Sequence, residues 1–219
     1  VWPLPQTGQM WLEYELLKNP SVPGYFCVST SYRNEPNPVK DRHYLIFPMF
    51  EFEMKGGMEE MIKMEEELLQ YLGYDCSKFL RGKYTDVAQE YGVTELENEH
   101  ENRLYEEKTP TFFLTDFPEF TSPFWNMKRN GDSANKVDVI ISGQETIGSA
   151  ERETDRDVMF NRFMTIMNGD YKDKMYELFG ETRTMDEMKE FLNFDFFERS
   201  GGGIGVTRLI RSMKMEGLM

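Results

Sequence analysis

The sequence predicts an α+β protein in which an antiparallel sheet is flanked by helices. Strand-like runs follow one another for most of the chain, with helical segments inserted between them. Hydrophobic residues make up 39% and aromatic residues 14% of 219 residues, enough to bury one core. No internal repeat, low-complexity tract or long linker divides the chain. We therefore expect residues 1–219 to form one domain.

The first half of the chain predicts a helix, a hairpin and a second helix. Apolar residues at helical spacing predict a helix over 8–17, which an Asn-Pro pair ends. Aromatic and β-branched runs predict strands over 24–30 and 44–53, and the polar loop between them predicts a hairpin with a long functional tip. In 57–72, methionine and leucine share one face while the glutamates lie largely off it, which predicts a surface helix.

The second half predicts further strands and helices. After an acidic, partly helical stretch, strands are expected over 111–116, 136–142 and 145–151, the last two joined by a turn at Gly143. Helical spacing predicts helices over 152–167 and 171–179, the second ended by Gly180. Near the C-terminus we expect a strand, a glycine turn and a final helix, over 191–197, 201–203 and 204–215.

The composition excludes several functions. Lysine and arginine total 25 against 39 aspartate and glutamate, a net charge of −14. Sequence-blind binding to nucleic acid or to an anionic membrane needs a cationic face, so neither is expected. The longest apolar run, residues 44–50, is too short to span a bilayer, and no basic-then-apolar leader opens the chain. We expect a soluble, cytoplasmic protein with no membrane partner.

Asp138 and Glu145 form a candidate metal pair. Asp138 lies among apolar residues of a predicted strand, where an ordinary strand needs no acid, and Glu145 follows across the Gly143 turn. If the two strands pair, both carboxylates can converge on a hard cation such as magnesium, which takes oxygen ligands and shares them with phosphates. From the residues alone, the simpler interpretation is that the pair consists of one acid on an edge strand and one unrelated acid in a hairpin.

Four arginines form a second candidate group. Arg33, Arg42, Arg152 and Arg208 each lie near a turn or a strand edge. Singly, such arginines are usually solvated, but together they could clamp the oxygens of a nucleoside triphosphate and of a carboxylate. The glycines before the final helix let backbone approach a ligand, although most glycine turns are only turns.

These motifs, in this order, resemble the class II aminoacyl-tRNA synthetases. Motif 2 of that family resembles YRNEPNPVKDRHYLIFPMFEFE, and motif 3 resembles GGGIGVTRLIRSMK. The SGQLYLE segment of asparaginyl-tRNA synthetases is similar to TGQMWLEYE, with Leu12 where aspartyl enzymes place a lysine. The aspartyl and asparaginyl core resembles TFFLTDFPE, PFWNM and DVIISGQETIGSAERE. The resemblance covers nearly the whole chain and implies the catalytic-domain fold of that family.

The resemblance implies an ATP site in which Arg33 and Arg208 are the catalytic residues. Arg33 would hold the α-phosphate, while Arg208 would cover the far side of the nucleotide and reach the γ-phosphate. The other implied ATP contacts are Glu35 with the adenine amino group, Phe47 stacked on the adenine, Arg42 and His43 near the β- and γ-phosphates, and Glu145.

The resemblance also implies a metal site and an amino-acid site. Asp138 and Glu145 match the magnesium ligands, which reverses the simpler interpretation of that pair. Gln9 would meet the α-amino group of the substrate, and Arg152 would hold its distal carboxylate or amide. ATP and Mg²⁺ are therefore the expected cofactors. Attack of a carboxylate on the α-phosphate needs alignment and neutralised charge rather than a covalent protein group.

The sequence also departs from the family. It contains no counterpart of motif 1, which builds the family's dimer interface, and none of the anticodon-binding domain. Thr207 replaces the acid usual before the motif 3 arginine, and Ile46 replaces the acid usual before Phe47. The segment GGGIGVTR is closer to ammonia-dependent asparagine synthetase, a relative of this fold.

Two enzymatic functions follow, both with aspartate or asparagine and ATP as substrates. We expect a tRNA-independent paralogue that activates aspartate and passes it to ammonia, making asparagine. The alternative is the catalytic domain of an asparaginyl-tRNA synthetase, for which tRNA is a partner. The acidic charge and the single lysine of the motif 2 loop favour the first, because gripping RNA requires phosphate neutralisation. In either case the resemblance implies a homodimer.

Overall fold

The computed structural model describes residues 4–34, 38 and 44–219. Within this part, the strands form one sheet in the order β1-β2-β8-β7-β6-β4-β3, and a short β5 pairs with β6. Their bounds are β1 Gly24–Tyr32, β2 Ile46–Lys55, β3 Phe79–Lys83, β4 Thr111–Pro118, β5 Arg129–Asn130, β6 Ser133–Ile141, β7 Gln144–Glu151 and β8 Arg199–Gly205. The predicted α+β class, a sheet flanked by helices, is confirmed.

The sheet is mixed rather than purely antiparallel, because β3 and β4 run parallel. Two helices connect the end of β3 to the start of β4, which is the kind of crossover that a parallel pair requires. The sequence FLRGK of β3 shows no alternation of apolar and polar side chains. Periodicity therefore could not predict this strand.

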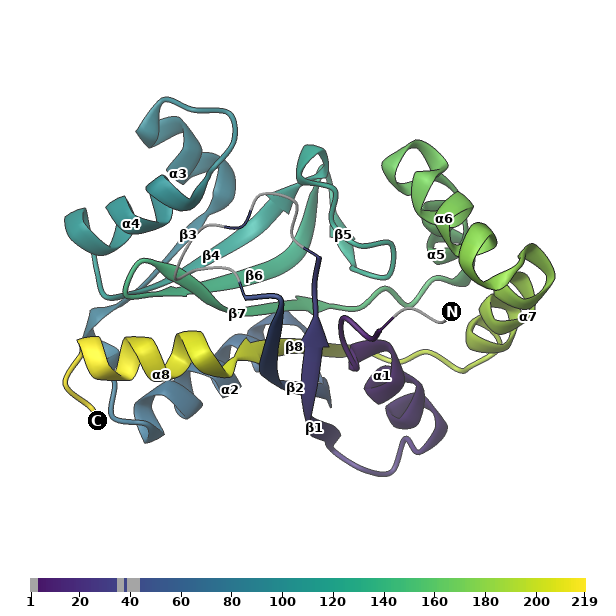
Figure 1. The fold of residues 1–219 in the computed structure, drawn as a ribbon, viewed down its shortest axis with the longest axis horizontal. Coiled ribbons are helices and arrows are strands. Elements are labelled where there is room, and N and C mark those ends of the chain that lie inside the picture. Colours follow the sequence, from purple (N-terminus) through teal and green to yellow (C-terminus); the bar gives the residue numbers. More distant parts are fainter. Residues whose placement is uncertain (1–3, 35–37, 39–43) are drawn as a thin grey trace.

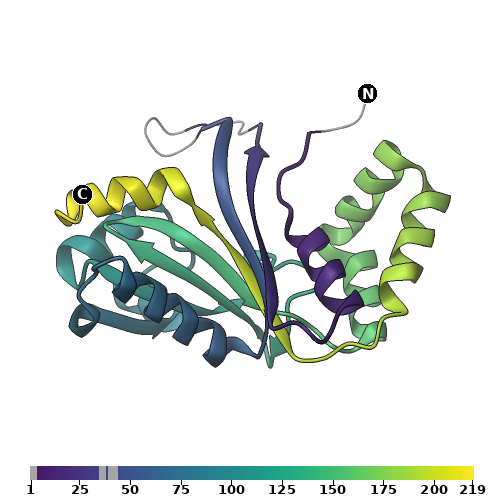
Figure 2. The ribbon, with the colours of Figure 1, turned by 90° about the horizontal axis from the view of Figure 1, so that it is seen from below.

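The helices lie on two sides of the β1–β2 hairpin. Their bounds are α1 Gln9–Lys18, α2 Met58–Tyr71, α3 Tyr84–Tyr91, α4 Asn98–Glu107, α5 Arg156–Thr165, α6 Asp170–Phe179, α7 Glu181–Leu192 and α8 Val206–Met215, with 3₁₀ turns at Cys76–Lys78, Glu119–Thr121 and Ile166–Gly169. Figures 1 and 2 show α1, α5, α6 and α7 as a lobe on one side, and α2, α3, α4 and α8 on the other. No helix of the described part is long and apolar enough to cross a membrane.

The central core lies between the sheet and α2. Val137, Val139 and Ile147 pack there with Met61 and Leu69 of the helix. Alternate residues of the same strands point to the opposite face, because successive side chains of a strand alternate. That opposite face is open in the middle of the sheet and holds the pockets described below.

The C-terminal part differs from the sequence prediction. The expected strand over 191–197 is wrong, since α7 extends to Leu192, and the expected glycine turn is wrong, since Gly201–203 lie inside β8. A Cβ on Gly202 would lie 2.5 Å from Ser149 Cβ, and one on Gly201 would overlap the Glu53 carboxylate. The glycines are thus needed for close packing between β2 and β7 rather than for a turn.

The predicted helix over 152–167 begins later, at Arg156. The Asp155 carboxylate accepts hydrogen bonds from the backbone N–H groups of Asp157 and Val158, at 2.9 and 3.0 Å, and so caps the helix. Arg152 instead pairs with Met127 in an isolated bridge.

Candidate active site

Two joined pockets occupy the open face of the sheet. The outer pocket lies between the β1–β2 hairpin and the start of α8 and is lined by Arg33, Phe47, Glu145 and Arg208. The inner pocket lies toward α1 and is lined by Gln9, Arg33, Asp138, Glu145 and Arg152. Both pockets include Arg33 and Glu145, so they are continuous. The structure therefore brings together seven of the predicted site residues.

The outer pocket combines an aromatic ring with two guanidinium groups. The Arg33 guanidinium lies over the Phe47 ring, 5.2 Å from its centroid. Arg208 is in the first turn of α8, and its Nη1 donates a hydrogen bond to the Glu145 carbonyl oxygen at 2.6 Å. A planar base could stack on Phe47, and phosphates could contact the arginines.

The other predicted ATP contacts, Glu35, Arg42 and His43, lie outside the described residues. Their roles stay predictions.

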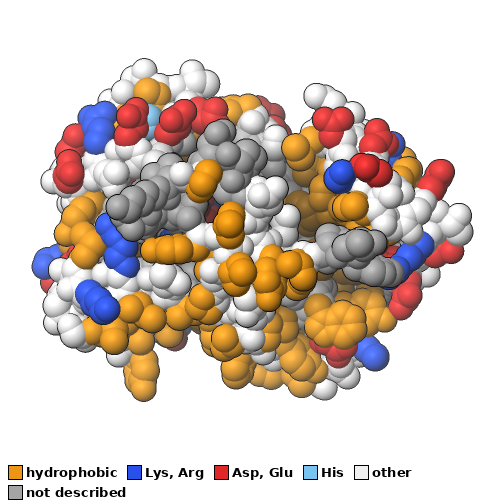
Figure 3. Space-filling model, viewed as in Figure 1, with side chains coloured by type: hydrophobic (Ala, Val, Ile, Leu, Met, Phe, Trp, Pro, Cys, Tyr) orange, Lys and Arg blue, Asp and Glu red, His pale blue; other side chains and the backbone are white. Residues whose placement is uncertain are grey.

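Charge on this face is unevenly distributed. In Figure 3, acidic side chains gather over the α3–α4 region and over the α5–α7 lobe, whereas basic side chains lie over α8. The basic residues of α8 are Arg208, Arg211 and Lys214. A polyanion such as a nucleoside triphosphate would thus meet positive charge on the α8 side of the site.

Asp138 and Glu145 lie close together although they are not directly paired. Asp138 is opposite Gly148, and a register shift between Val139 and Ile140 separates it from Glu145. A Cβ on Gly148 would lie 2.9 Å from Glu145 Oε1 and 3.5 Å from Asp138 Oδ1, so both oxygens border the same small space. The glycine leaves the space between the two carboxylates open.

The surroundings of Asp138 suit a cation. Burial raises the pKa of this carboxyl to about 7, and Lys136, whose Nζ is 2.5 Å from Asp138 Oδ2, opposes that rise. Asp138 Oδ1 is buried and has no hydrogen-bond partner among the described residues. A divalent ion would satisfy this oxygen and favour the ionised form.

The donor set therefore fits magnesium, provided that phosphate oxygens or waters complete the shell. The described residues contain no group of three or more His, Cys, Asp or Glu arranged for a metal. Magnesium normally binds one or two carboxylates together with substrate phosphates. Lys136 was missed by the sequence analysis, although its spacing of two from Asp138 places it on the same face of β6.

Gln9 is positioned by a carboxylate that the sequence analysis also missed. Glu51 of β2 is fully buried and accepts hydrogen bonds from Gly8 N at 2.9 Å, from Ser29 Oγ at 2.5 Å and from Thr7 Oγ1. These bonds fix the start of α1. Gln9 Nε2 then lies 3.3 Å from the point where a Cβ on Gly203 would be, over the sheet and inside the inner pocket.

Arg152 reaches the inner pocket but is already paired. Its Nε donates to Glu53 Oε1 at 3.1 Å, its Nη2 contacts the same oxygen, and both side chains are buried. Burial raises the Glu53 pKa to about 7, while Arg152 lowers it. The alternation of Glu51 and Glu53 in FEFE was the available signal for these two acids.

A second buried pair lies behind Arg152. Arg199 Nη2 and Nε donate to Glu13 Oε1 at 2.6 and 2.9 Å, and Asn126 Nδ2 donates to Glu13 Oε2 at 2.8 Å. Glu13 and Arg199 are 186 positions apart in the chain. No local pattern indicates that they meet.

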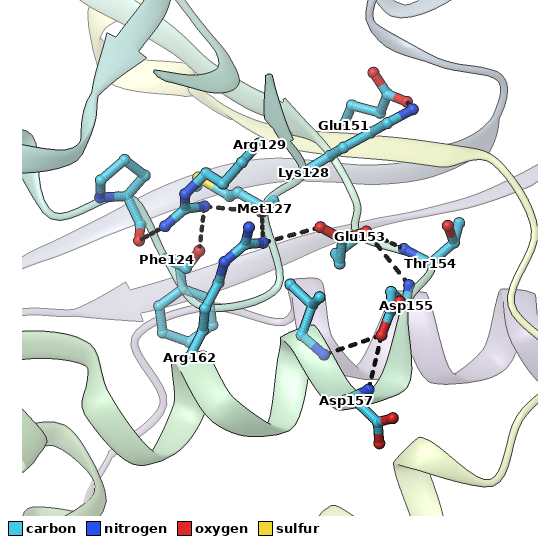
Figure 4. A network of polar contacts seen from close by, with 12 residues as sticks. Phe124, Met127, Lys128, Arg129, Glu151, Glu153, Thr154, Asp155, Asp157 and Arg162 are labelled. Carbon is cyan, nitrogen blue, oxygen red and sulfur yellow. Dashed lines mark hydrogen bonds and ion pairs between the residues drawn. The ribbon is translucent and has the colours of Figure 1, made fainter. Parts of the chain in front are cut away.

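A loop before β5 forms one wall of the inner pocket. Arg129 Nη1 donates to the carbonyl oxygens of Phe124 and Met127 at 3.1 and 2.8 Å, and Arg162 Nη1 donates to Met127 O at 3.2 Å and to Glu153 Oε2 at 2.9 Å. Figure 4 shows both guanidinium groups turned toward this loop. The wall residue Met127 is therefore held by its backbone rather than by packing alone.

A family model described as tRNA synthetases class II (D, K and N) matches residues 2–216, and the chain belongs to this family. The expected resemblance is thus confirmed. Comparison with curated protein sequences gives no match.

Solved structures share this fold at low sequence identity. The asparaginyl-tRNA synthetase of Pyrococcus horikoshii complexed with asparaginyl-adenylate is 22% identical, with a TM-score of 0.76 over 95% of this chain and 52% of that one. The asparaginyl-tRNA synthetase of Entamoeba histolytica in complex with asparaginyl-adenylate is 19% identical, with a TM-score of 0.77 over 97% of this chain and 54% of that one. The aspartyl-tRNA synthetase of the same organism is 21% identical, with a TM-score of 0.74 over 98% of this chain and 49% of that one. This chain spans about half the length of these proteins.

Proposed function

We propose that this chain is the catalytic domain of a synthetase that activates asparagine with ATP and transfers it to tRNA. The observation that carries the proposal is the continuity of the two pockets through Arg33 and Glu145. ATP in the outer pocket and an amino acid in the inner pocket would meet at these two side chains. Membership of a tRNA synthetase family supports the same reaction class.

The chemistry is adenylate formation. The α-carboxylate of the amino acid attacks the α-phosphorus, a P–O bond forms, and pyrophosphate leaves. Arg33, at the junction of the pockets, would neutralise the α-phosphate, while Phe47 and Arg208 would hold the nucleotide. Magnesium held by Asp138 and Glu145 would supply further charge neutralisation at the phosphates. Gln9 would orient the α-amino group.

The state of Arg152 favours asparagine over aspartate. Its Nε and Nη2 already bond to Glu53, so the side-chain carboxylate of a bound aspartate would lie beside a second carboxyl group, which is unfavourable. A carboxamide can still donate to and accept from such a pair. Leu12 is buried and offers no cation in place of the lysine of aspartyl enzymes. Two of the similar structures hold asparaginyl-adenylate.

The acceptor is the second part of the proposal. The sequence favoured a tRNA-independent route to asparagine, but the comparisons do not support that route. The matching family comprises tRNA synthetases, and the similar structures are asparaginyl- and aspartyl-tRNA synthetases. We therefore propose tRNA as the acceptor. The homodimer that the resemblance implies stays a prediction, which sedimentation equilibrium would check.

The test is ATP–pyrophosphate exchange over the set of amino acids, with magnesium and without RNA. Exchange with asparagine, weaker with aspartate, is expected. Exchange only with an unrelated amino acid would reject the pocket assignment. Adding tRNA should then give asparaginyl-tRNA, whereas aspartate with ammonium and no RNA should give no free asparagine. Free asparagine in that last reaction would restore the tRNA-independent route.

A matched pair of variants tests the role of Arg152. Lysine cannot reproduce the bidentate geometry of arginine, so Arg152→Lys should lower exchange on the order of 100-fold with ATP binding retained. Arg156→Lys is the control, since Arg156 is exposed on α5 and contacts Phe194 and Asp195 instead. Equal activity of the two variants would remove Arg152 from the substrate site.

A further inference from the structure

The tip of the β6–β7 hairpin is an irregular segment next to the site. Ser142 and Gly143 both have positive φ, 48° and 78°, and form the turn. The register shift between Val139 and Ile140 lies just before it. Such bulges re-aim side chains near functional sites. The direction in which the Glu145 side chain points therefore depends on the contacts that hold this segment in place.

Helix α8 holds the tip from one side. Arg208 Nη1 donates to Glu145 O at 2.6 Å, and Arg211 Nη1 donates to Ser142 O at 3.0 Å. The Ser142 hydroxyl in turn donates to Glu216 Oε1 at 2.8 Å, just beyond the end of α8. These bonds fix the carbonyl side of the turn and of Glu145.

Helix α4 holds the tip from the other side. Glu101 Oε2 accepts a hydrogen bond from Glu145 N at 2.9 Å. Figure 1 shows the end of the β6–β7 pair between α4 and α8. The peptide groups of Glu145 are therefore held at the N–H by Glu101 and at the carbonyl by Arg208. Glu101 comes from a part of the chain 44 positions away.

The Glu101 side chain lies near the proposed metal site but is not arranged as a third metal ligand. It lines the small cavity that Asp138 also lines. The described residues contain no trio of acids, histidines or cysteines arranged for a metal, so Glu101 is not placed as a third ligand. One contact of this carboxyl group is the hydrogen bond that it accepts from the backbone N–H of Glu145.

We propose that Glu101 is a positioning residue for Glu145: by holding the Glu145 N–H from α4, it aims that carboxylate at the cation shared with Asp138. This rests on the proposed function, in which Glu145 and Asp138 hold magnesium. In this proposal Glu101 acts through the backbone of Glu145 and is not itself a ligand of the cation. Its effect is on the affinity for the metal, in the manner of groups that orient ligands from behind.

The test measures metal binding directly, with Mn²⁺ as the probe and ATP present, by electron paramagnetic resonance of the free ion. Glu101→Ala should weaken Mn²⁺ binding about tenfold. Glu101→Gln should stay within about twofold of wild type, because the amide oxygen can still accept from Glu145 N. Glu106→Ala, on the same helix and exposed, removes the same charge and should change nothing.

The outcomes are distinguishable. Wild-type binding of Mn²⁺ by Glu101→Ala, or binding by Glu101→Gln as weak as that of Glu101→Ala, overturns the positioning role. If Glu101→Ala loses its circular dichroism, Glu101→Asp, one methylene shorter, replaces it and should show the weaker binding. A wild-type chain that binds no Mn²⁺ with ATP rejects the proposed function itself, and the positioning role with it.

Discussion

The two faces of the sheet differ in chemistry although the same strands build both. In β6, Val137 and Val139 pack against α2, whereas Lys136 and Asp138 line the inner pocket. β2 repeats the pattern, with Phe52 in the core and Glu51 and Glu53 fully buried on the pocket face. The core face is stabilised by non-directional burial, whereas the pocket face holds charges whose burial is costly unless they are paired.

This difference predicts how each face responds to change. Truncating a core side chain costs stability through the cavity it leaves. Removing one member of a buried charge pair leaves the other charge uncompensated, which costs more. Only the pocket face should also change catalysis, because its charges lie at or behind the proposed ligands.

The largest effect on stability is expected at Arg199. Arg199→Ala leaves the Glu13 carboxylate buried without its cationic partner and should lower the free energy of unfolding by about 3–5 kcal/mol. Urea denaturation measures it. The exposed pair of Arg183 and Glu187, 2.7 Å apart on α7, is the control, and Arg183→Ala should cost about 0.5 kcal/mol or less. Similar losses in both variants would contradict the expected difference between a buried and an exposed ion pair.

Ile147 tests the core face alone. Ile147→Ala removes a fully buried side chain from the cluster under α2 and should cost about 2–4 kcal/mol. At temperatures where the variant is still folded, the KM for ATP should equal that of the wild type. A changed KM would show that the core face also shapes the pockets.

Glu145 tests the pocket face through catalysis. Glu145→Gln keeps the volume but removes a charge that the proposed cation needs, so magnesium-dependent exchange should fall on the order of 100-fold. Unfolding in urea should be nearly unchanged, because Glu145 is only partly buried. Near-normal exchange would return Asp138 and Glu145 to the simpler interpretation.

Glu65 breaks the pattern, because it is an acid on the core side. It lies on α2, it is fully buried, and burial raises its pKa from 4.5 to about 8. The folded state therefore holds this proton more tightly than the unfolded state. Its contribution to stability is present in full below about pH 4.5 and is lost as the pH rises toward 8.

Glu65→Gln should remove that dependence. As the pH rises from 6 to 9, the free energy of unfolding of the variant should increase relative to that of the wild type by on the order of 2 kcal/mol. Urea denaturation at the two pH values measures it, with Glu67→Gln, exposed on the same helix, as the control. A gain that is the same at both pH values would rule out the titration of Glu65.

The smallest effect is expected at Phe47. Phe47→Leu keeps an apolar side chain but removes the ring proposed to stack on adenine, so the KM for ATP should rise about tenfold or less. The KM for asparagine should not change, because Phe47 lines only the outer pocket. Equal changes in both KM values would indicate that the ring orders the whole site, through Arg33.

The positions of several candidate site residues could be predicted by combining local signals with the family motifs that the sequence resembles. Asp138 interrupts an apolar strand, and Glu145 follows one short turn later, so strand pairing alone brings them close. Arg33 and Phe47 lie at the two ends of one hairpin loop and meet when β1 and β2 pair. Gln9 begins a helix that periodicity places within one residue.

The tertiary structure decided what depends on distant contacts. Glycines signal backbone freedom, but only the position of β8 between β2 and β7 shows that Gly201–203 make room inside a sheet. Glu13 meets Arg199, and Glu101 meets the backbone of Glu145, because separate elements pack together. Periodicity encodes which face a side chain occupies. Periodicity carries no information about which distant residue that side chain will contact.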